Sequence, residues 1–339
     1  MTDALTFDTD RYLRLQQAAV ASAAPLAAAV DSLGDRLRNV FFLGAGGAGI
    51  LMAPAALLLA SRSSVPCYHW VGAELMAHGS RHLGEGSLVV IPSLSGTTPD
   101  ALDHLRFARA AGATIVALVG HLDTPIADEA DAVVVVGAAD DTSSESFYLQ
   151  SLILALTVMN RRGEYPDLAG ALAQLAGVPE ALLAAKLGFE GTAAELAERI
   201  AAHDFHVFTG AGPSWTEAYY FAMCILEEMQ WIRTRPVQAS DFFHGTLELV
   251  EPGVSVVLLK GEGASRAQAE RVEAFCAEHT DALTVLDVAG VALPGVSDDL
   301  RALLAPVVQA ALLERVACHV ERLRDHPLTT RRYYRRVTY

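Results

Sequence analysis

Short runs of apolar, mainly β-branched residues alternate with longer helical patterns along the first half of the chain. Apolar runs without polar alternation are typical of strands buried on both faces, and therefore of a parallel sheet covered by helices. The runs predict strands at Asn39–Leu43, Ser87–Ile91, Thr114–Val119 and Ala132–Val136. Helices are predicted for residues 9–33, for a segment ending near Ala60, and for Pro99–Ala111 and Ser146–Asn160. The first half thus reads as an α/β unit.

The second half of the chain repeats the pattern of the first. Phe42-Leu43-Gly44-Ala45-Gly46 corresponds to Phe208-Thr209-Gly210-Ala211-Gly212, and His78-Gly79 corresponds to His244-Gly245 at the same offset. Matched landmarks without a gap indicate two copies of one unit. We therefore expect two tandem three-layer α/β/α units with parallel sheets, related by internal duplication. The expected boundaries are an N-terminal helix in residues 1–34, a first copy in 35–165, and a second copy in 185–339 that includes a C-terminal tail.

Composition and charge narrow the function classes. Of the 339 residues, 52% are hydrophobic and 19% are charged, so the chain can build a large core. The net charge of −15 argues against nucleic acid and anionic membranes as partners, although backbone dipoles can still bind a small anion. The uncharged stretch Val40–Ser61 could span a bilayer, but its glycines and Pro54 divide it into strand, turn and helix.

The cysteines and the N-terminus indicate a cytoplasmic protein. The four cysteines lie far apart and form no CxxC pair, so we expect neither a metal site nor a disulfide framework. The acidic N-terminus has no apolar signal region. Reduced cysteines are the default in the cytosol.

A hydroxyl-rich loop follows the second predicted strand. Thr98 is placed to cap the next helix and Pro99 to open it, so unpaired N–H groups point at the loop. Hydroxyl and N–H donors at a helix N-terminus suit a phosphate monoester, and the lysine of a nucleotide P-loop is missing. The second copy has Lys260 and Glu262 here instead of hydroxyls. The candidate phosphate-binding residues are Ser93, Ser95, Gly96, Thr97 and Thr98.

The glycine turn after the first strand has two interpretations. Gly44, Gly46 and Gly49 satisfy the dinucleotide fingerprint GxGxxG. However, no acidic residue ends the next strand about 20 residues further on, as that fingerprint requires. We therefore expect no nucleotide cofactor. The turn is interpreted as bringing the backbone of Gly46 and Gly47 close to a sugar phosphate.

The second copy supplies candidate acid–base residues. Glu227 and Glu228 lie near the end of a predicted helix, Trp215–Trp231, and adjacent helical residues point about 100° apart, so only one of them is expected to face the solvent. A carboxylate within the apolar segment FAMCILEEMQW makes a better base. Glu228 is the preferred base and Glu227 the alternative. His244 is the candidate acid, although a lone histidine is often structural.

The glycine turn, the SxSGTT loop and the duplicated unit together resemble the double sugar isomerase (SIS) domain family. The segments most similar to its fructoselysine-6-phosphate deglycase group are Glu227-Glu228-Met229-Gln230-Trp231, Asp241-Phe242-Phe243-His244-Gly245, His326-Pro327-Leu328 and Arg331-Arg332-Tyr333. The resemblance implies that Glu228 and His244 form the acid–base pair, and that the histidine reaches the site of a neighbouring subunit in a homodimer. It also implies a sugar contact at Ser143.

The implied reaction is the cleavage of a fructosamine 6-phosphate to an aldose 6-phosphate and a free amine through an enaminol, without metal or redox cofactor. Ile225 replaces the lysine of synthase-type relatives, which argues against ammonia-using synthesis. Two alternatives stay open: an aldose–ketose isomerase or amino-sugar-phosphate deaminase, and a non-enzymatic sugar-phosphate sensor, which would not need Glu228. A tail rich in arginine is also typical of an RNA-binding arm, but at a net charge of −15 we expect docking on an acidic subunit surface by Arg331, Arg332, Arg335 and Arg336.

Overall fold

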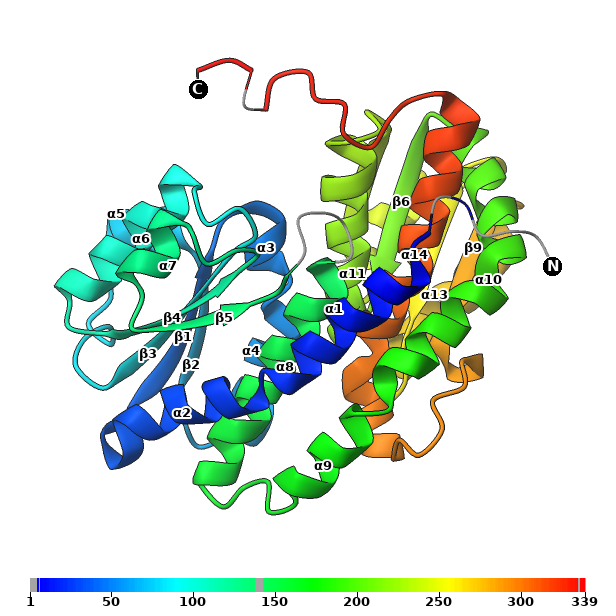
Figure 1. Cartoon of the computed structure of the whole chain (residues 1–339). Coiled ribbons are helices and arrows are strands. Elements are labelled where there is room, and N and C mark those ends of the chain that lie inside the picture. Colours follow the sequence, from blue (N-terminus) through cyan, green and yellow to red (C-terminus); the bar gives the residue numbers. More distant parts are fainter. Residues whose placement is uncertain (1–4, 6, 138–142, 335, 339) are drawn as a thin grey trace. The chain divides into compact units, whose positions relative to one another are not determined.

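The computed structural model describes residues 5, 7–137, 143–334 and 336–338 (Figure 1). The chain forms two compact units, each of which is described by itself. The first comprises Thr9–Glu180 and Gly295–Ser297. The second comprises Ala181–Pro294 and Asp298 to the C-terminus, together with the N-terminal residues up to Asp8. The narrower boundaries expected for the two copies stay a prediction.

The first unit holds a five-stranded parallel sheet, as the apolar runs predict. Its strands are β1 (Asn39–Gly44), β2 (Cys67–Val71), β3 (Ser87–Ser93), β4 (Thr114–Val119) and β5 (Ala132–Val135). They are arranged in the order β2-β1-β3-β4-β5, and every pair is parallel. The apolar runs did not predict β2, which lies at the sheet edge and is only partly buried.

Helices cover both faces of this sheet. One face carries α5 (Gly72–His78), α6 (Pro99–Ala110) and α7 (Pro125–Glu129) (Figure 1). The other carries α1 (Thr9–Ala21), α2 (Ala23–Leu33), α4 (Ala53–Arg62) and α8 (Ser143–Arg161). The single helix predicted for 9–33 is broken at Ser22, because Pro25 has no N–H to donate to the carbonyl of Ala21. The unit also contains α3 (Gly46–Ile50), η1 (Gly34–Arg36) and α9 (Leu168–Leu175).

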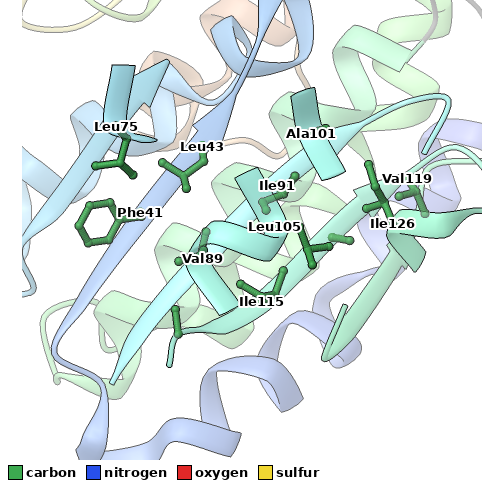
Figure 2. Packing of buried hydrophobic residues seen from close by; sticks show 13 residues of the cluster. Phe41, Leu43, Leu75, Val89, Ile91, Ala101, Leu105, Ile115, Val119 and Ile126 are labelled. Carbon is green, nitrogen blue, oxygen red and sulfur yellow. The ribbon is translucent and has the colours of Figure 1, made fainter. Parts of the chain in front are cut away.

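Alternate strand residues of the first sheet pack against α5, α6 and α7. Phe41 and Val89 point to the same face as Ile115 because side chains alternate along a strand. They form one buried cluster with Leu75 of α5 and Leu105 of α6, shown in Figure 2. This packing fixes the carboxyl ends of β1 and β3, on which the candidate site is built.

The second unit repeats this architecture with one strand fewer. Its strands are β6 (Phe205–Gly210), β7 (Arg233–Gln238), β8 (Ser255–Lys260) and β9 (Leu283–Asp287). Their order, β7-β6-β8-β9, matches β2-β1-β3-β4 of the first sheet, and all pairs are parallel. The identical order supports the internal duplication. The other elements are α10 (Val178–Ala201), α11 (Pro213–Tyr220), the π-helix η2 (Phe221–Glu227), α12 (Ala239–Phe242), η3 (Thr246–Leu249), α13 (Arg266–His279), η4 (Val288–Gly290) and α14 (Asp298–Arg324).

Among the residues that the structure describes, two helical stretches are long and apolar enough to cross a membrane, Leu168–Ala201 and Asp298–Arg324. In the second, 83% of the apolar window is buried inside the protein, so core packing accounts for its composition. The uncharged stretch Val40–Ser61 forms β1, α3 and most of α4 rather than one membrane-spanning helix.

A buried network of charges ties α10 to α14. The Arg315 side chain is 1% exposed; its Nε donates to Glu190 Oε2 at 2.9 Å. Its Nη2 donates to the carbonyl oxygen of Leu5 at 2.6 Å. His319 Nε2 lies 2.9 Å from the other oxygen of Glu190. Removing one member of such a network leaves a buried charge without its partner.

We expect Arg315→Met to lower the free energy of unfolding by about 3–5 kcal/mol, because Glu190 loses its bidentate partner inside the protein. The matched control is Arg106→Gln, which breaks an ion pair with Glu129 in which Arg106 is 57% exposed. That variant should cost less than about 1 kcal/mol. Denaturant unfolding of both variants measures the difference, and equal losses would contradict the assignment.

Candidate functional site

The glycine turn and the hydroxyl loop lie at the ends of adjacent strands. β1 and β3 are neighbours and parallel, so both end at the carboxyl edge of the first sheet. The chain leaves β1 towards β2 on one side and leaves β3 towards β4 on the other. Open α/β sheets bind ligands in the crevice at such a reversal of strand order. The structure therefore brings these two predicted motifs together.

The glycine turn is close-packed. A Cβ on Gly44 would lie 2.4 Å from the Cα of Gly49, so no side chain fits there. Gly46 has a φ of +57°, is exposed, and begins α3, which also contains the half-buried Gly47. His69 Nε2 lies 2.8 Å from the carbonyl oxygen of Gly49, and burial lowers the pKa of His69, which favours the neutral ring. The turn thus presents backbone rather than side chains at the sheet edge.

The hydroxyl groups of the loop after β3 converge. Ser95 Oγ lies 3.3 Å from Thr98 Oγ1, and Thr97 Oγ1 donates to Ser95 Oγ at 3.2 Å. Thr98 occupies the N-cap position of α6, but its side chain makes no capping hydrogen bond, contrary to the expectation. The hydroxyl of Ser93 is buried and has no hydrogen-bond partner within the described part of the chain. Donors in this loop and at the start of α6 suit an anion.

Gly96 shapes the loop. Its φ is +62°, and a Cβ there would lie 2.3 Å from Thr124 Oγ1 and 2.5 Å from Thr124 Cβ. Thr124 is itself buried and caps α7 through the N–H of Ala127. Gly96 N–H donates to the carbonyl of Ser93 at 3.0 Å, which closes the turn. The loop conformation therefore depends on a residue without a side chain.

We expect Gly96→Ala to weaken the binding of glucose 6-phosphate by about tenfold or more, because the added methyl group displaces the loop from Thr124. The control is Gly79→Ala, since Gly79 has a similar φ of +69° but no atom within 4 Å of the added Cβ. Gly79, with a ψ of 173°, lies in a backbone region that is essentially restricted to glycine, so Gly79→Ala should cost about 1–3 kcal/mol of stability and leave the affinity unchanged. Titration calorimetry measures both affinities, and unchanged binding by Gly96→Ala would remove the loop from the site.

The corresponding edge of the second sheet carries ion pairs. Lys260 Nζ, at the end of β8, lies 2.7 Å from Glu273 Oε2 and 3.3 Å from Asp287 Oδ2. Arg266 Nη2 lies 2.7 Å from Asp287 Oδ2, and its hydrogen bond lowers the pKa of Asp287 to about 2. These charged side chains pair with one another, and residues 260–264 after β8 include no hydroxyl group, so the second copy lacks the hydroxyl cradle of the first.

Glu228 lies at the opposite, amino edge of the second sheet. Glu228 comes directly after η2, and its N–H donates to the carbonyl oxygen of Met223, five residues earlier in the chain. The continuous α-helix predicted for Trp215–Trp231 is therefore corrected to α11 followed by a π-helix, a form frequent at functional sites. The carboxylate is 37% exposed and its Oε1 accepts from Arg331 Nε at 2.9 Å. Glu227 instead accepts a hydrogen bond from Thr234 Oγ1 at 2.6 Å.

A pocket of about 780 Å³ opens beside Glu228. Its lining includes Trp231, Arg233, Arg331 and Arg332. Arg331 contacts Glu228 of its own chain, whereas Arg332 packs over the ring of Trp231 at 4.2 Å. The expected docking of the tail arginines on a subunit surface stays a prediction. Sequence reasoning did not connect Arg331 with Glu228, because nothing in their spacing links residues so far apart. Arg335 lies outside the described residues.

His244 and Glu228 lie at opposite edges of the same sheet. Glu228 precedes the start of β7, and the exposed His244 follows its end after α12. β7 spans Arg233–Gln238, about 20 Å at 3.3 Å per residue. The length of β7 therefore separates the two side chains within one chain, and His244 does not line the pocket beside Glu228.

The roles of all the candidate site residues stay predictions, and the side chain of Ser143 cannot be placed among them. Ser143 is the first residue of α8, its side chain is not described, and residues 138–142 before it lie outside the described part. In the described residues, no group of three or more potential metal ligands occurs.

Comparison with known proteins agrees with this architecture. The SIS domain model matches residues 36–160. The chain is 30% identical to the fructosamine deglycase FrlB of Bacillus subtilis, over 91% of this chain and 95% of that protein. The chain belongs to the double sugar isomerase (SIS) domain family. It is also 27% identical to the fructoselysine 6-phosphate deglycase of Escherichia coli K12, over 87% of this chain and 85% of that protein.

Solved SIS structures superpose over nearly the whole chain. One is described as a phosphosugar isomerase from Bacillus subtilis; it has a TM-score of 0.88 and 27% identity and covers 95% of this chain and 99% of its own. Another from Salmonella typhimurium has a TM-score of 0.87 and 25% identity, and covers 95% and 97%. These relatives are named as deglycases and phosphosugar isomerases. This SIS protein is therefore an enzyme of the family rather than a non-enzymatic member. The predicted family and fold class are thus confirmed.

Proposed function

We propose that this SIS enzyme cleaves a fructosamine 6-phosphate into an aldose 6-phosphate and a free amine. The observation that carries the proposal is the convergence of hydroxyls in the loop Ser93–Thr98 at the carboxyl edge of the first sheet, on a chain whose full-length relatives are named deglycases. Phosphate is largely dianionic at neutral pH and suits neutral donors at a helix N-terminus.

We assign phosphate binding to the hydroxyl loop of the first copy and proton transfer at the reacting carbons to Glu228. In the open-chain ketosamine, the Glu228 carboxylate removes a proton from carbon 1 while His244 donates one to the carbonyl oxygen of carbon 2, which gives an enaminol. Return of the proton to carbon 2 gives an imine at carbon 1. Water then adds to the imine, and the carbon–nitrogen bond breaks to release the amine and the aldose 6-phosphate.

The proposed active unit is a cytoplasmic homodimer. Glu228 and His244 lie at opposite edges of one sheet, so we assign the two groups of one site to different subunits. A second copy of the chain is the simplest source of the second side chain. Exposed His244 is available for such a contact.

The direct test is turnover of synthetic fructoselysine 6-phosphate, with glucose 6-phosphate measured through a coupled dehydrogenase and lysine measured by amino-acid analysis. We expect equal amounts of the two products and no turnover of fructose 6-phosphate or glucosamine 6-phosphate. Turnover of either of those sugars without deglycation would favour the isomerase or deaminase alternative. Binding without any turnover would favour a sensor.

A further inference from the structure

The guanidinium of Arg331 contacts the side chain that the proposed mechanism uses as its base. Arg331 Nε donates to Glu228 Oε1 at 2.9 Å, and the Arg331 side chain is only 19% exposed. Glu228 Oε2 has no protein partner among the described residues. One carboxylate oxygen is therefore fixed by a charge-assisted hydrogen bond, while the other remains available at the pocket.

Arg331 is itself held in place. Its Nη1 donates to the carbonyl oxygen of Leu328 at 2.6 Å and to that of Thr330 at 3.0 Å. These contacts fix the plane of the guanidinium before it meets the carboxylate. Because the arginine is already ordered, the carboxylate is oriented at little further cost in side-chain entropy.

The segment that carries Arg331, residues 326–332, is anchored next to Glu228; we call it the C-terminal strap. Gln230 Nε2 donates to the carbonyl of His326 at 2.6 Å, and the Leu328 N–H donates to Glu321 Oε1 at 2.9 Å. Trp231 adopts a φ of +56°, which is unusual for a bulky residue, and its ring contacts both His326 and Arg332. A backbone conformation of this kind persists only where surrounding contacts hold it.

We propose that Arg331 is a positioning residue that orients the Glu228 carboxylate for proton transfer, so that the C-terminal strap completes the site. The proposal rests on the proposed function, because it takes Glu228 as the base. Proton transfer requires the acceptor oxygen within hydrogen-bond reach of carbon 1, and small misplacements are costly in rate. Without Arg331 the carboxylate would rotate freely about its last bond.

Arg331→Gln is expected to lower kcat for fructoselysine 6-phosphate by about 100-fold and to change KM by less than about threefold. Arg331→Lys keeps the charge without the fixed fork, and should recover part of the loss. Added guanidinium should partly rescue an Arg331→Ala variant. The matched control is Arg336→Gln, which removes the same charge from the same tail without touching Glu228 and should leave kcat unchanged.

A double-mutant comparison separates positioning from other roles. If Arg331 acts through Glu228, Glu228→Gln combined with Arg331→Gln should be no slower than Glu228→Gln alone. Multiplied losses, a raised KM with unchanged kcat, or a faster Arg331→Gln enzyme would each overturn the positioning role. If Glu228→Gln is inactive while Arg331→Gln is fully active, this inference alone fails. If Glu228→Gln keeps full activity, or the natural enzyme does not turn over the substrate, the proposed function fails and this inference with it.

Discussion

Glu228→Gln is expected to lower kcat for fructoselysine 6-phosphate by about 10²–10⁴-fold, with little change in KM. Glutamine keeps the shape of the side chain and can still meet Arg331, but it cannot accept the proton from carbon 1. In the proposed assignment the phosphate group supplies binding energy that does not depend on the base, so KM is expected to change little. Single-turnover and steady-state kinetics measure the two parameters.

The adjacent glutamate provides the comparison for this prediction. Glu227 accepts hydrogen bonds from the backbone and the hydroxyl of Thr234, so its carboxylate is already engaged in the same chain. Glu227→Gln should therefore lose much less activity than Glu228→Gln. The reverse order of losses would assign the base to Glu227, the alternative that the sequence left open.

Mixed dimers of two inactive variants should regain activity. If His244 serves the neighbouring subunit's site, a dimer that pairs Glu228→Gln with His244→Ala has one doubly altered site and one intact site. Random pairing of the two chains then gives about a quarter of the natural activity. Co-expression of the variants with different affinity tags allows the mixed dimer to be isolated. Per dimer, it should show about half the activity of a dimer formed by two natural chains.

Each variant purified alone provides the baseline for the mixing experiment. Both should stay nearly inactive, because every site in either dimer lacks one of the two groups. A mixed dimer that is no more active than these baselines would place Glu228 and His244 outside any shared site. In that case the separation of Glu228 and His244 along β7 would have no role in catalysis.

The sequence predicts the strands with apolar runs well, including the edge strand β5, but misses the more polar edge strands β2 and β7. β3 and β4 are continuous apolar runs because both faces of each strand are buried, and their pattern is unmistakable. β7 begins Arg-Thr-Arg-Pro and is only partly buried, so it carries no such signal. Two further features depend on local hydrogen bonding, which the spacing of apolar residues does not predict. They are the break between α1 and α2, and the π-helix η2.

In the candidate site, too, the sequence predicts some contacts and only the structure shows others. Hydroxyls close together in the sequence, such as Ser95 and Thr98, are also close in the structure because one short turn contains both. The contact between Glu228 and Arg331 joins residues on different elements, and only the folded chain reveals it. The opposite placement of Glu228 and His244 follows from the direction of β7, which the spacing of the two residues alone does not disclose.

The most direct test of the division of labour between the two copies is a crystal structure of the enzyme with a slowly reacting fructosamine 6-phosphate analogue. We predict that the phosphate contacts the hydroxyls of Ser95 and Thr98, and that a Glu228 carboxylate oxygen lies within hydrogen-bond reach of carbon 1 or carbon 2. A phosphate bound elsewhere, or a Glu228 side chain facing solvent away from the sugar, would contradict the account.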